Sequence, residues 1–513
     1  MNMPADSNIP IYVAIGIFVG LALIWVFAIN CHRRHWWNRV LLSAGAERLI
    51  DPPHNESKEQ GELIKEKQSG DTGRSLRRRA GRPREPQTKG RHAYASQDLG
   101  SMQNMNTNIN PVDNEESRPK KERLKSLDTF RGISIVIMIF VNYKGGGYWF
   151  FHHSRWNGLT VADLVFPWFV FIMGTSMAFS YSSLLQKCVP KWKIFLKILK
   201  RSCILFVLGL IVNTAGGNSP VSLPHLRIPG VLQRFALTYL ITASVHLVFI
   251  READIHMHSY WSRARDILYY WPEWIINFML ISLHCALTFG LDVPKCPKGY
   301  LGPGGEADMG KYSNCTGGVA GYIDRQVLGD NHIYSNPTCK EIYNTKVPYD
   351  PEGILGTITS CFMCFLGLQA GKILMYFKDV RGRVVRFLSW GFVLSLIAAI
   401  LCKFSKDDGW IPINKNLWSL SFVLCLAGMA FIVLTVCYLM IDVWKIWNGA
   451  PFYYPGMNSI VIYLGHEVFH NAFPVKWAVP PTHASLLPLN LWGTFFWVIV
   501  AIFLYCKRVF VAI

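Results

Sequence analysis

The sequence predicts an all-α polytopic membrane protein with about eleven transmembrane helices in a lipid bilayer. Of its 513 residues, 51% are hydrophobic and only 17% are charged, whereas soluble domains carry about a quarter charged residues. Apolar windows close to the ~20 residues of a bilayer span recur along the chain. Lys and Arg gather in the short segments between these windows, as they do in the cytosolic loops of membrane proteins.

The apolar windows predict helices because none of them alternates polar and apolar residues, as a transmembrane strand would. The first window could also be a signal peptide, but it lacks a basic segment before it and a clear cleavage site after it. We therefore expect a retained anchor helix over residues 1–30. The eleven windows cover residues 11–30, 132–143, 164–183, 194–213, 230–250, 274–291, 353–376, 384–402, 417–440, 457–470 and 489–506.

The formal net charge of +19 would suggest nucleic-acid binding in a soluble chain. Here the basic clusters, such as "NCHRRHWWNR" and "YFKDVRGRVVR", fall on one side of the membrane when the number of spans is odd. This distribution explains the charge, so we expect no nucleic-acid partner. It also predicts a lumenal N-terminus and a cytosolic C-terminus.

Residues 31–122 form a polar, basic, Pro-containing segment with little apolar periodicity. Such a segment cannot bury enough apolar surface to offset the entropy of ordering, so we predict a disordered cytosolic linker. It contains "EQGELI", an acidic residue, three further residues and then Leu-Ile. This pattern is used for endosomal and lysosomal sorting. Residues 123–513 then form a ten-helix transmembrane domain.

The longest loop of that domain, residues 292–350, is predicted to lie in the lumen. Its sequon "NCT" at Asn314 agrees with this side, because N-glycosylation requires a lumenal acceptor. The loop also carries Cys296, Cys315 and Cys339, two of which we expect to pair in an oxidising lumen. Which two is left open. No His or Cys pattern along the chain predicts a metal site.

The stretch "VNYKGGGYWFFHHSRWNGLTVADLVFPW", residues 141–168, lies between two apolar windows. Gly145, Gly146 and Gly147 permit backbone conformations that other residues avoid, so the helix is expected to break there. Broken segments at membrane depth generally line a cavity. Asn142 directly precedes the break, and its amide is either a structural cap or a donor to a developing oxyanion.

Two adjacent histidines, His152 and His153, follow the break, and Trp156, Asn157 and Asp163 come shortly after them. A histidine in a lumenal loop is often only a polar surface residue. Here a carboxylate at the start of the next span can orient an imidazole that titrates near neutrality. That arrangement is typical of a general base, and it predicts a catalytic site in this stretch.

The cytosolic start of the second span reads "SLDTFRG". Ser126 or Asp128 can cap the helix while Arg131 extends toward the interface. Alternatively, the helix N-terminus and Arg131 can bind a phosphate. Both interpretations stay open.

Further ionisable side chains lie at membrane depth, where each suggests a function. A buried ion-pair network of Arg234, Glu352 and Glu467 is the structural alternative. His466 and Glu467 are neighbours on different faces of a helix, so we expect that they do not share one partner. Lys372 lies toward the cytosolic end of its span, where its ammonium is expected to reach the interface.

The chain resembles the heparan-alpha-glucosaminide N-acetyltransferase family of lysosomal membrane enzymes. The resemblance runs in order over residues 120–513, through "SLDTFRGISIVIMIFVNYKGGGYWFF", "IPGVLQR", "YDPEGILGTI", "GLQAGKI", "KNLWSLSFVL" and "NSIVIYLGHEVF". It implies transfer of an acetyl group from cytosolic acetyl-CoA to the terminal glucosamine amine of heparan sulfate in the lysosomal lumen, as part of heparan sulfate degradation. Only about ten residues precede the first window, so we expect the family's N-terminal lumenal domain to be lacking, and the odd cysteine fits a lost partner.

The resemblance also implies roles for particular residues. The family's active histidine falls on His153, and Asn142 and Asp163 complete the expected catalytic group. His153 acts either as a base for direct transfer or as a nucleophile that carries the acetyl group. The nucleotide of acetyl-CoA is expected at the cytosolic mouth, on Ser126, Asp128 and Arg131. Expected substrate-binding residues are Trp156, Asn157, Arg234, Glu352 and His466.

Two alternatives remain on the sequence alone. The chain could be a membrane acyltransferase for another amino sugar or glycan, which a panel of acceptors would distinguish. It could also be a small-solute transporter, in which the intramembrane ionisable residues form a permeation path; no internal repeat supports this. A homodimer is compatible with either function.

Overall fold

The computed structural model describes residues 11–16, 19–20, 124–215, 222–250 and 264–511. Within these ranges the chain is helical, and its one extended pairing is an isolated bridge between Asn157 and Asn414. The predicted linker over residues 31–122 and most of the first window lie outside the described residues. The prediction of an all-α polytopic membrane protein is confirmed.

Seven of the described helices are long and apolar enough to cross a membrane. The windows at 132–143, 194–213 and 457–470 also fall on helices, α3 (Lys125–Asn142), α5 (Lys191–Ala215) and α15 (Ser459–Val468), which are shorter or less apolar. The total number of spans and their orientation stay predictions. The seven are α4 (Val161–Gln186), α6 (Val231–Phe249), α8 (Trp271–Gly290), α11 (Ile354–Tyr376), α12 (Val380–Leu401), α13 with η7 (Leu420–Cys437 and Tyr438–Val443) and α16 (His483–Cys506).

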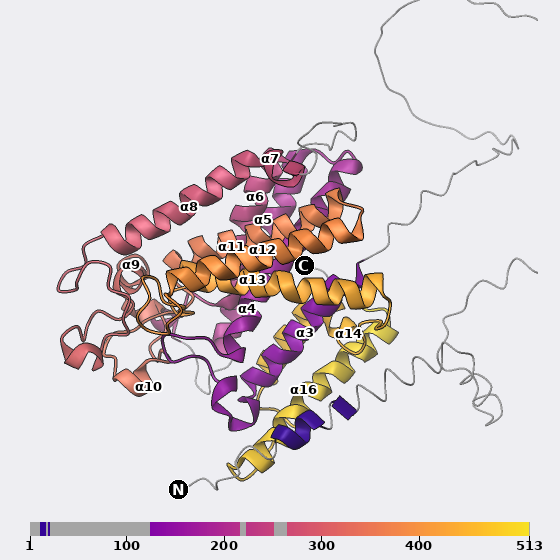
Figure 1. Ribbon diagram of the computed structural model, residues 1–513. Coiled ribbons are helices and arrows are strands. Elements are labelled where there is room, and N and C mark those ends of the chain that lie inside the picture. The colour runs from indigo at the N-terminus through magenta and orange to yellow at the C-terminus, as the bar shows by residue number, and fades with distance from the viewer. Residues whose placement is uncertain (1–10, 17–18, 21–123, 216–221, 251–263, 512–513) are drawn as a thin grey trace, which may run out of the picture. The chain divides into compact units, whose positions relative to one another are not determined.

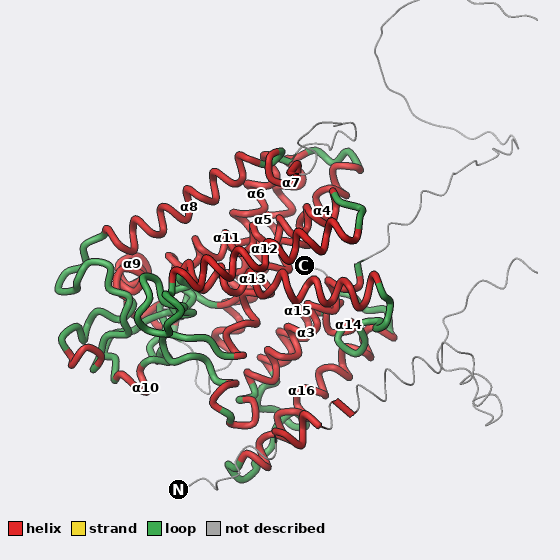
Figure 2. Tube along the Cα trace, in the orientation of Figure 1, coloured by secondary structure: helices red, strands yellow, loops and turns green. Residues whose placement is uncertain are grey.

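Short elements connect the long helices on both sides. Near the glycine stretch lie η1 (Gly145–Gly147) and η2 (Trp149–Phe151). The other short elements are η3 (Leu223–His225), α7 (Arg265–Leu268), η5 (Ala307–Gly310), α9 (Gly318–Leu328), η6 (Asp330–His332), α10 (Lys340–Tyr343) and α14 (Tyr453–Met457). Figures 1 and 2 show that most of the loop structure gathers at one end of the long helices, around α9 and α10.

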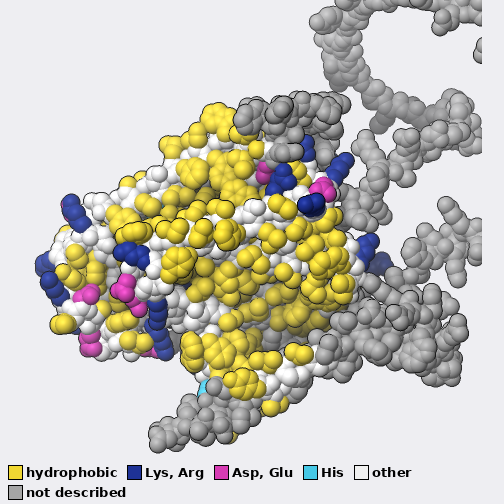
Figure 3. Space-filling view, in the orientation of Figure 1, with side chains coloured by type: hydrophobic (Ala, Val, Ile, Leu, Met, Phe, Trp, Pro, Cys, Tyr) yellow, Lys and Arg dark blue, Asp and Glu magenta, His cyan; other side chains and the backbone are white. Residues whose placement is uncertain are grey.

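Helix α11 lies at the centre of the helix packing. Of its span 89% is buried, against 22% of the α8 span. Glycines let α11 approach α4 closely: a Cβ on Gly367 would lie 1.9 Å from the Phe171 carbonyl oxygen, and one on Gly174 would lie 1.9 Å from that of Cys364. Such small-residue contacts are typical of membrane helices, where packing rather than water exclusion holds helices together. The apolar side chains of α8 and α12 remain exposed, and Figure 3 shows hydrophobic side chains over the flank of the molecule.

The lysine on α11 corrects one expectation. Lys372 does not extend to the interface: it is 1% exposed, and its Nζ lies 2.6 Å from Glu273 Oε2 on α8. The other oxygen of Glu273 lies 2.9 Å from His246 Nδ1 on α6. The buried carboxylate is a partner for both basic side chains, so the ammonium of Lys372 is stabilised inside the helix packing instead of at the interface.

The loop over residues 292–350 and its neighbours form a separate small core. The core includes Trp156, Tyr349 and Leu417. A disulfide joins Cys296 to Cys315, while Cys339 is buried and free. This pairing resolves the choice that the sequence left open. Asn314 is exposed beside the disulfide, as a glycan acceptor must be.

The predicted helix break is present. Helix α3 ends at Asn142, and Gly145, Gly146 and Gly147 have φ values of 52°, 71° and 79°. These left-handed values are costly for residues with a Cβ, which explains why glycines stand here. The break turns the chain back toward α4 and so brings the two histidines to the N-terminal end of that helix.

Candidate active site

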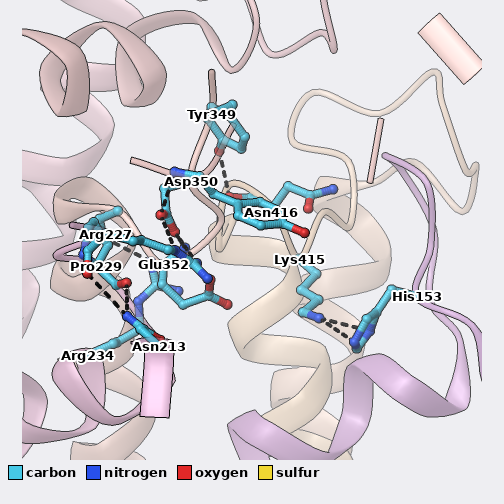
Figure 4. A network of polar contacts seen from close by, with 12 residues as sticks. His153, Asn213, Arg227, Pro229, Arg234, Tyr349, Asp350, Glu352, Lys415 and Asn416 are labelled. Atoms are coloured by element: carbon cyan, nitrogen blue, oxygen red, sulfur yellow. Dashed lines mark hydrogen bonds and ion pairs between the residues drawn. The ribbon is translucent and has the colours of Figure 1, made fainter. Parts of the chain in front are cut away.

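His153 lies between a carboxylate and an ammonium group, and Figure 4 shows its contact with the ammonium group of Lys415. Its Nδ1 is 2.8 Å from Asp163 Oδ1. Lys415 Nζ is 2.8 Å from Nδ1 and 3.2 Å from Nε2, and 3.7 Å from the same carboxylate oxygen. Because a carboxylate only accepts, the Nδ1 proton belongs to the Asp163 bond. Nε2 then carries the lone pair, so the imidazole has the tautomer that a base or nucleophile needs.

Asp163 is fixed by the start of α4. Its second oxygen accepts hydrogen bonds from the backbone N–H and the hydroxyl of Thr160 and from the backbone N–H of Ser154, at 2.9–3.1 Å. Thr160 and Asp163 form the capping box of the helix, a strictly local motif. The carboxylate is therefore held by the helix end with one oxygen and orients His153 with the other.

Lys415 was not predicted from the sequence, and it comes from the segment between α12 and α13. Its two neighbours are anchored. Asn414 is fully buried and donates to Asn157 Oδ1 at 3.0 Å, and the Tyr349 hydroxyl donates to the Asn416 carbonyl at 2.6 Å. These bonds fix the backbone on both sides of Lys415. Its position on the side predicted to be lumenal, against the cytosolic preference of Lys, was the signal that the sequence offered.

These neighbours change the acidity of His153. Burial, followed by the positive charge of Lys415, lowers the pKa of the imidazole below its usual value, against the opposing effect of Asp163 and Glu352. The neutral imidazole is thus retained at lower pH than in water. His152 is exposed, and partial burial and the charges of Arg155 and Lys144 lower its pKa too. Of the adjacent pair, His153 is the one with an orienting carboxylate.

Asn142 belongs to a second polar group. Its Nδ2 lies 3.0 Å from both His466 Nε2 and Glu467 Oε1. His466 is buried, and its Nδ1 donates to the Ile462 carbonyl at 3.2 Å, so its Nε2 accepts from Asn142. The expectation that His466 and Glu467 do not share a partner was wrong. Glu467 lies in the last turn of α15, where its longer side chain reaches around the helix to the amide.

Asn142 uses both of its amide protons in these bonds. In this state it is not a free donor for an oxyanion, and within the described residues its bonds go to α15 rather than to His153. The structure therefore brings His153 and Asp163 together, and it places Asn142 in a neighbouring group with His466.

A polar cavity of about 200 Å³ adjoins that second group. Gln233 lies in its wall, is 2% exposed, and neither atom of its amide has a hydrogen-bond partner among the described residues. The cavity lies at the ends of α5, α6 and α15 that face the large loop. Its lining residues are Gly209, Val212, Asn213, Arg227, Val231, Leu232, Gln233, Tyr463 and Glu467.

Arg227, not Arg234, forms the ion pairs beside this cavity (Figure 4). Its guanidinium lies 2.8 Å from both oxygens of Asp350 and 2.8 Å from Glu352 Oε2. Arg234 is 1% exposed, donates to the Gly353 carbonyl and lies over the Trp418 ring. The expected network of Arg234, Glu352 and Glu467 does not form. Arg227, in the loop before α6, pairs with Glu352 instead.

Two expected substrate residues serve the loop framework. Trp156 is 3% exposed, and its indole donates to the Leu301 carbonyl, so its ring packs in the small core. Asn157 donates to Asp407 and accepts from Asn414. Both side chains therefore support the segment that carries Lys415.

The start of α3, which we predicted to face the cytosol, differs from the expected cap. Leu124 is the N-cap residue, and no side chain caps the helix from within. Instead, the Asp442 carboxylate from η7 lies close to Lys125 and Ser126 at this end of the helix. Arg131 bonds to Asp128 at 3.2 Å and to Ser176 at 2.7 Å. A carboxylate thus lies near the helix end where we expected a phosphate, and binding of the nucleotide there stays a prediction. Within the described ranges, no group of three or more His, Cys, Asp or Glu residues is arranged to hold a metal ion.

The fold and the paired polar groups define a polytopic helical membrane protein with a candidate active site at the loop-rich end of its helices. Residues 123–255 match the family model described as heparan-alpha-glucosaminide N-acetyltransferase, catalytic. A curated relative from Mus musculus, named heparan-alpha-glucosaminide N-acetyltransferase, is 45% identical over 99% of this chain and 72% of its own length. A relative of the same name from Homo sapiens is 52% identical over 76% of this chain. The chain belongs to this family, and it spans 59% of the length of the human relative.

Proposed function

We propose that the protein is an N-acetyltransferase that moves the acetyl group of acetyl-CoA to the terminal glucosamine amine of heparan sulfate at the lysosomal membrane. The names of the two relatives support this reaction class and acceptor. The single observation that carries the proposal is the contact of His153 with Asp163 and Lys415, since it supplies an oriented and neutral imidazole.

The chemistry requires a base because the acceptor amine is largely protonated in an acidic lumen. Nε2 of His153 takes a proton from the amine, which then attacks the acetyl carbonyl, and coenzyme A leaves as a thiol. Asp163 accepts from Nδ1 throughout, so it holds the ring in place and stabilises the imidazolium that forms. Lys415 Nζ lies within 3.2 Å of both ring nitrogens, so it must move away from Nε2 when the amine of the acceptor approaches.

A second route uses the same geometry. Nε2 attacks the acetyl carbonyl, the C–S bond breaks and coenzyme A leaves as a thiolate. The deprotonated amine then attacks the acyl-imidazole, the C–Nε2 bond breaks, and the proton lost by the amine nitrogen neutralises the thiolate. Both routes need a neutral imidazole whose Nδ1–H group donates a hydrogen bond to Asp163. The nucleotide end of acetyl-CoA carries several negative charges and stays outside the apolar core of the membrane. Ser126, Asp128 and Arg131 remain candidates for contact with it at the cytosolic end of α3.

The deciding experiment measures transfer of labelled acetyl from acetyl-CoA to glucosamine by the purified chain in detergent. His153→Ala is expected to abolish transfer, and His152→Ala, which removes the exposed neighbour, is expected to retain it. Loss of activity only in His152→Ala would overturn the assignment. Uptake of a solute by proteoliposomes without consumption of acetyl-CoA would instead favour a transporter.

A further inference from the structure

The cavity beside α15 has the properties of a prepared binding site for a small polar ligand. It holds about 200 Å³, less than the ~300–1,000 Å³ typical of pockets for drug-sized ligands. A single sugar ring is of the right size, and a nucleotide is too large. Its wall contains the buried amide of Gln233, whose donor and acceptor both lack a partner among the described residues. Burying such a group without a partner is costly, so a ligand that bonds to it recovers this free energy.

The Gln233 amide is held in place by two glycines. A Cβ on Gly209 of α5 would lie 2.4 Å from Gln233 Oε1, and a Cβ on Gly230 would lie 2.5 Å from the same atom. The side chain thus packs against bare backbone on two sides. Asn213 closes a third side, with its own amide bonded to the Pro229 carbonyl at 2.9 Å. The amide of this wall residue is therefore fixed before any ligand arrives.

The charges around the cavity favour a cation. Asp350, Glu352 and Glu467 contribute three carboxylates, and Arg227 and Arg234 contribute two guanidinium groups. Arg227 is fully engaged by Asp350 and Glu352, whereas Glu467 bonds to Asn142 and lies 3.4 Å from His466. Among the described residues, no Lys or Arg forms an ion pair with Glu467, so this carboxylate of the cavity wall is available to a cationic ligand. A phosphorylated nucleotide is repelled by such a wall, and an ammonium group is attracted.

Building on the proposed acetyl transfer, we propose that this cavity binds the terminal amino sugar of the acceptor. Glu467 holds the protonated amine, and the Gln233 amide bonds to ring hydroxyls. The amine then lies next to Asn142, whose Nδ2 is 3.0 Å from Glu467 Oε1. Glu352 connects the cavity to the base, since it pairs with Arg227 in the wall and acts electrostatically on His153.

The test measures binding of glucosamine and, separately, of acetyl-CoA to the full chain in detergent by calorimetry, without turnover. Gln233→Leu removes the amide. Gly209→Ala, a substitution on α5, displaces the Gln233 amide by adding a Cβ 2.4 Å from its Oε1. Each is expected to raise the Kd for glucosamine about tenfold, as for one or two lost hydrogen bonds, and to leave the Kd for acetyl-CoA unchanged. Asn490→Leu is the matched control, because its amide on α16 is also buried with an unpartnered nitrogen but lies outside the cavity.

Glu467→Gln provides the test of charge. It is expected to remove the preference for glucosamine over neutral N-acetylglucosamine, which the unaltered chain should show. Weakened acetyl-CoA binding in Gln233→Leu and Gly209→Ala would overturn the proposal and assign the cavity to the pantetheine arm. Unchanged glucosamine binding in both variants would overturn it as well. If glucosamine binds through Gln233 but no acetyl is transferred, the inference stands and the proposed function fails.

Discussion

Replacement of Lys415 by Met tests how the chain keeps His153 neutral in acid. The ammonium lies 2.8 and 3.2 Å from the two ring nitrogens. The His153 side chain is 36% exposed, so solvent screens the interaction and the dielectric constant of water is the conservative choice. Two unit charges about 3 Å apart in water repel by about 1.4 kcal/mol, a factor of about ten in an equilibrium constant.

The sign follows from the pKa. Burial and the charge of Lys415 lower the pKa of His153, and the neutral form is the active one. Lys415→Met therefore raises this pKa, and the acid limb of the pH–activity profile moves to higher pH. At a fixed pH on that limb, activity is expected to fall about tenfold relative to the plateau. The assay is acetyl transfer to glucosamine across the acidic range, at saturating acetyl-CoA.

Two controls isolate the local charge. Lys415→Arg keeps the charge, so the acid limb should stay near its original position. Lys406→Met removes a charge from an exposed side chain of the same segment and should leave the limb unchanged, because solvent screens it. The amine of the acceptor titrates identically in all variants, so a difference between limbs belongs to the enzyme. An acid limb that stays fixed or moves to lower pH in Lys415→Met would refute the reasoning.

Three further predictions concern orientation, packing and topology. Asp163→Asn preserves volume but offers no charge to the imidazolium, and kcat should fall by about a hundredfold or more with little change in the KM for acetyl-CoA. Gly367→Ala places a Cβ 1.9 Å from the Phe171 carbonyl oxygen and should lower the melting temperature in detergent or prevent folding. Gly290→Ala should leave the melting temperature unchanged, because no heavy atom lies within 4 Å of the added Cβ. Equal stability of the two variants would contradict the α4–α11 contact. Asn314→Gln should increase gel mobility if the loop is lumenal, and a mobility equal to that of the unaltered chain would count against that side.

The parts of the site that could be predicted from the sequence are those built from near neighbours. His153 and Asp163 are ten residues apart, and the capping box with Thr160 fixes the carboxylate by rules that act within one helical turn. The glycine break after Asn142 is equally local, because positive φ values at three consecutive positions require glycine.

The parts that failed depended on partners distant in the sequence. Lys415 is 262 residues from His153 and has no local feature that marks it as a neighbour. Arg227 replaced Arg234 as the partner of Glu352 because a loop residue reaches over the end of α6, while Arg234 points into the helix packing. Lys372 pairs with Glu273 on another helix instead of extending to the interface.

The sequence by itself determined the class of this protein, its helical spans and the carboxylate–histidine pair, because hydropathy and helix capping act over one span or one turn. The tertiary structure decided which charges meet: the ammonium beside His153, the guanidinium in the cavity wall and the glutamate beside Asn142. These contacts depend on how helices pack side by side, and in a low-dielectric interior each buried charge takes the partner that packing brings within reach.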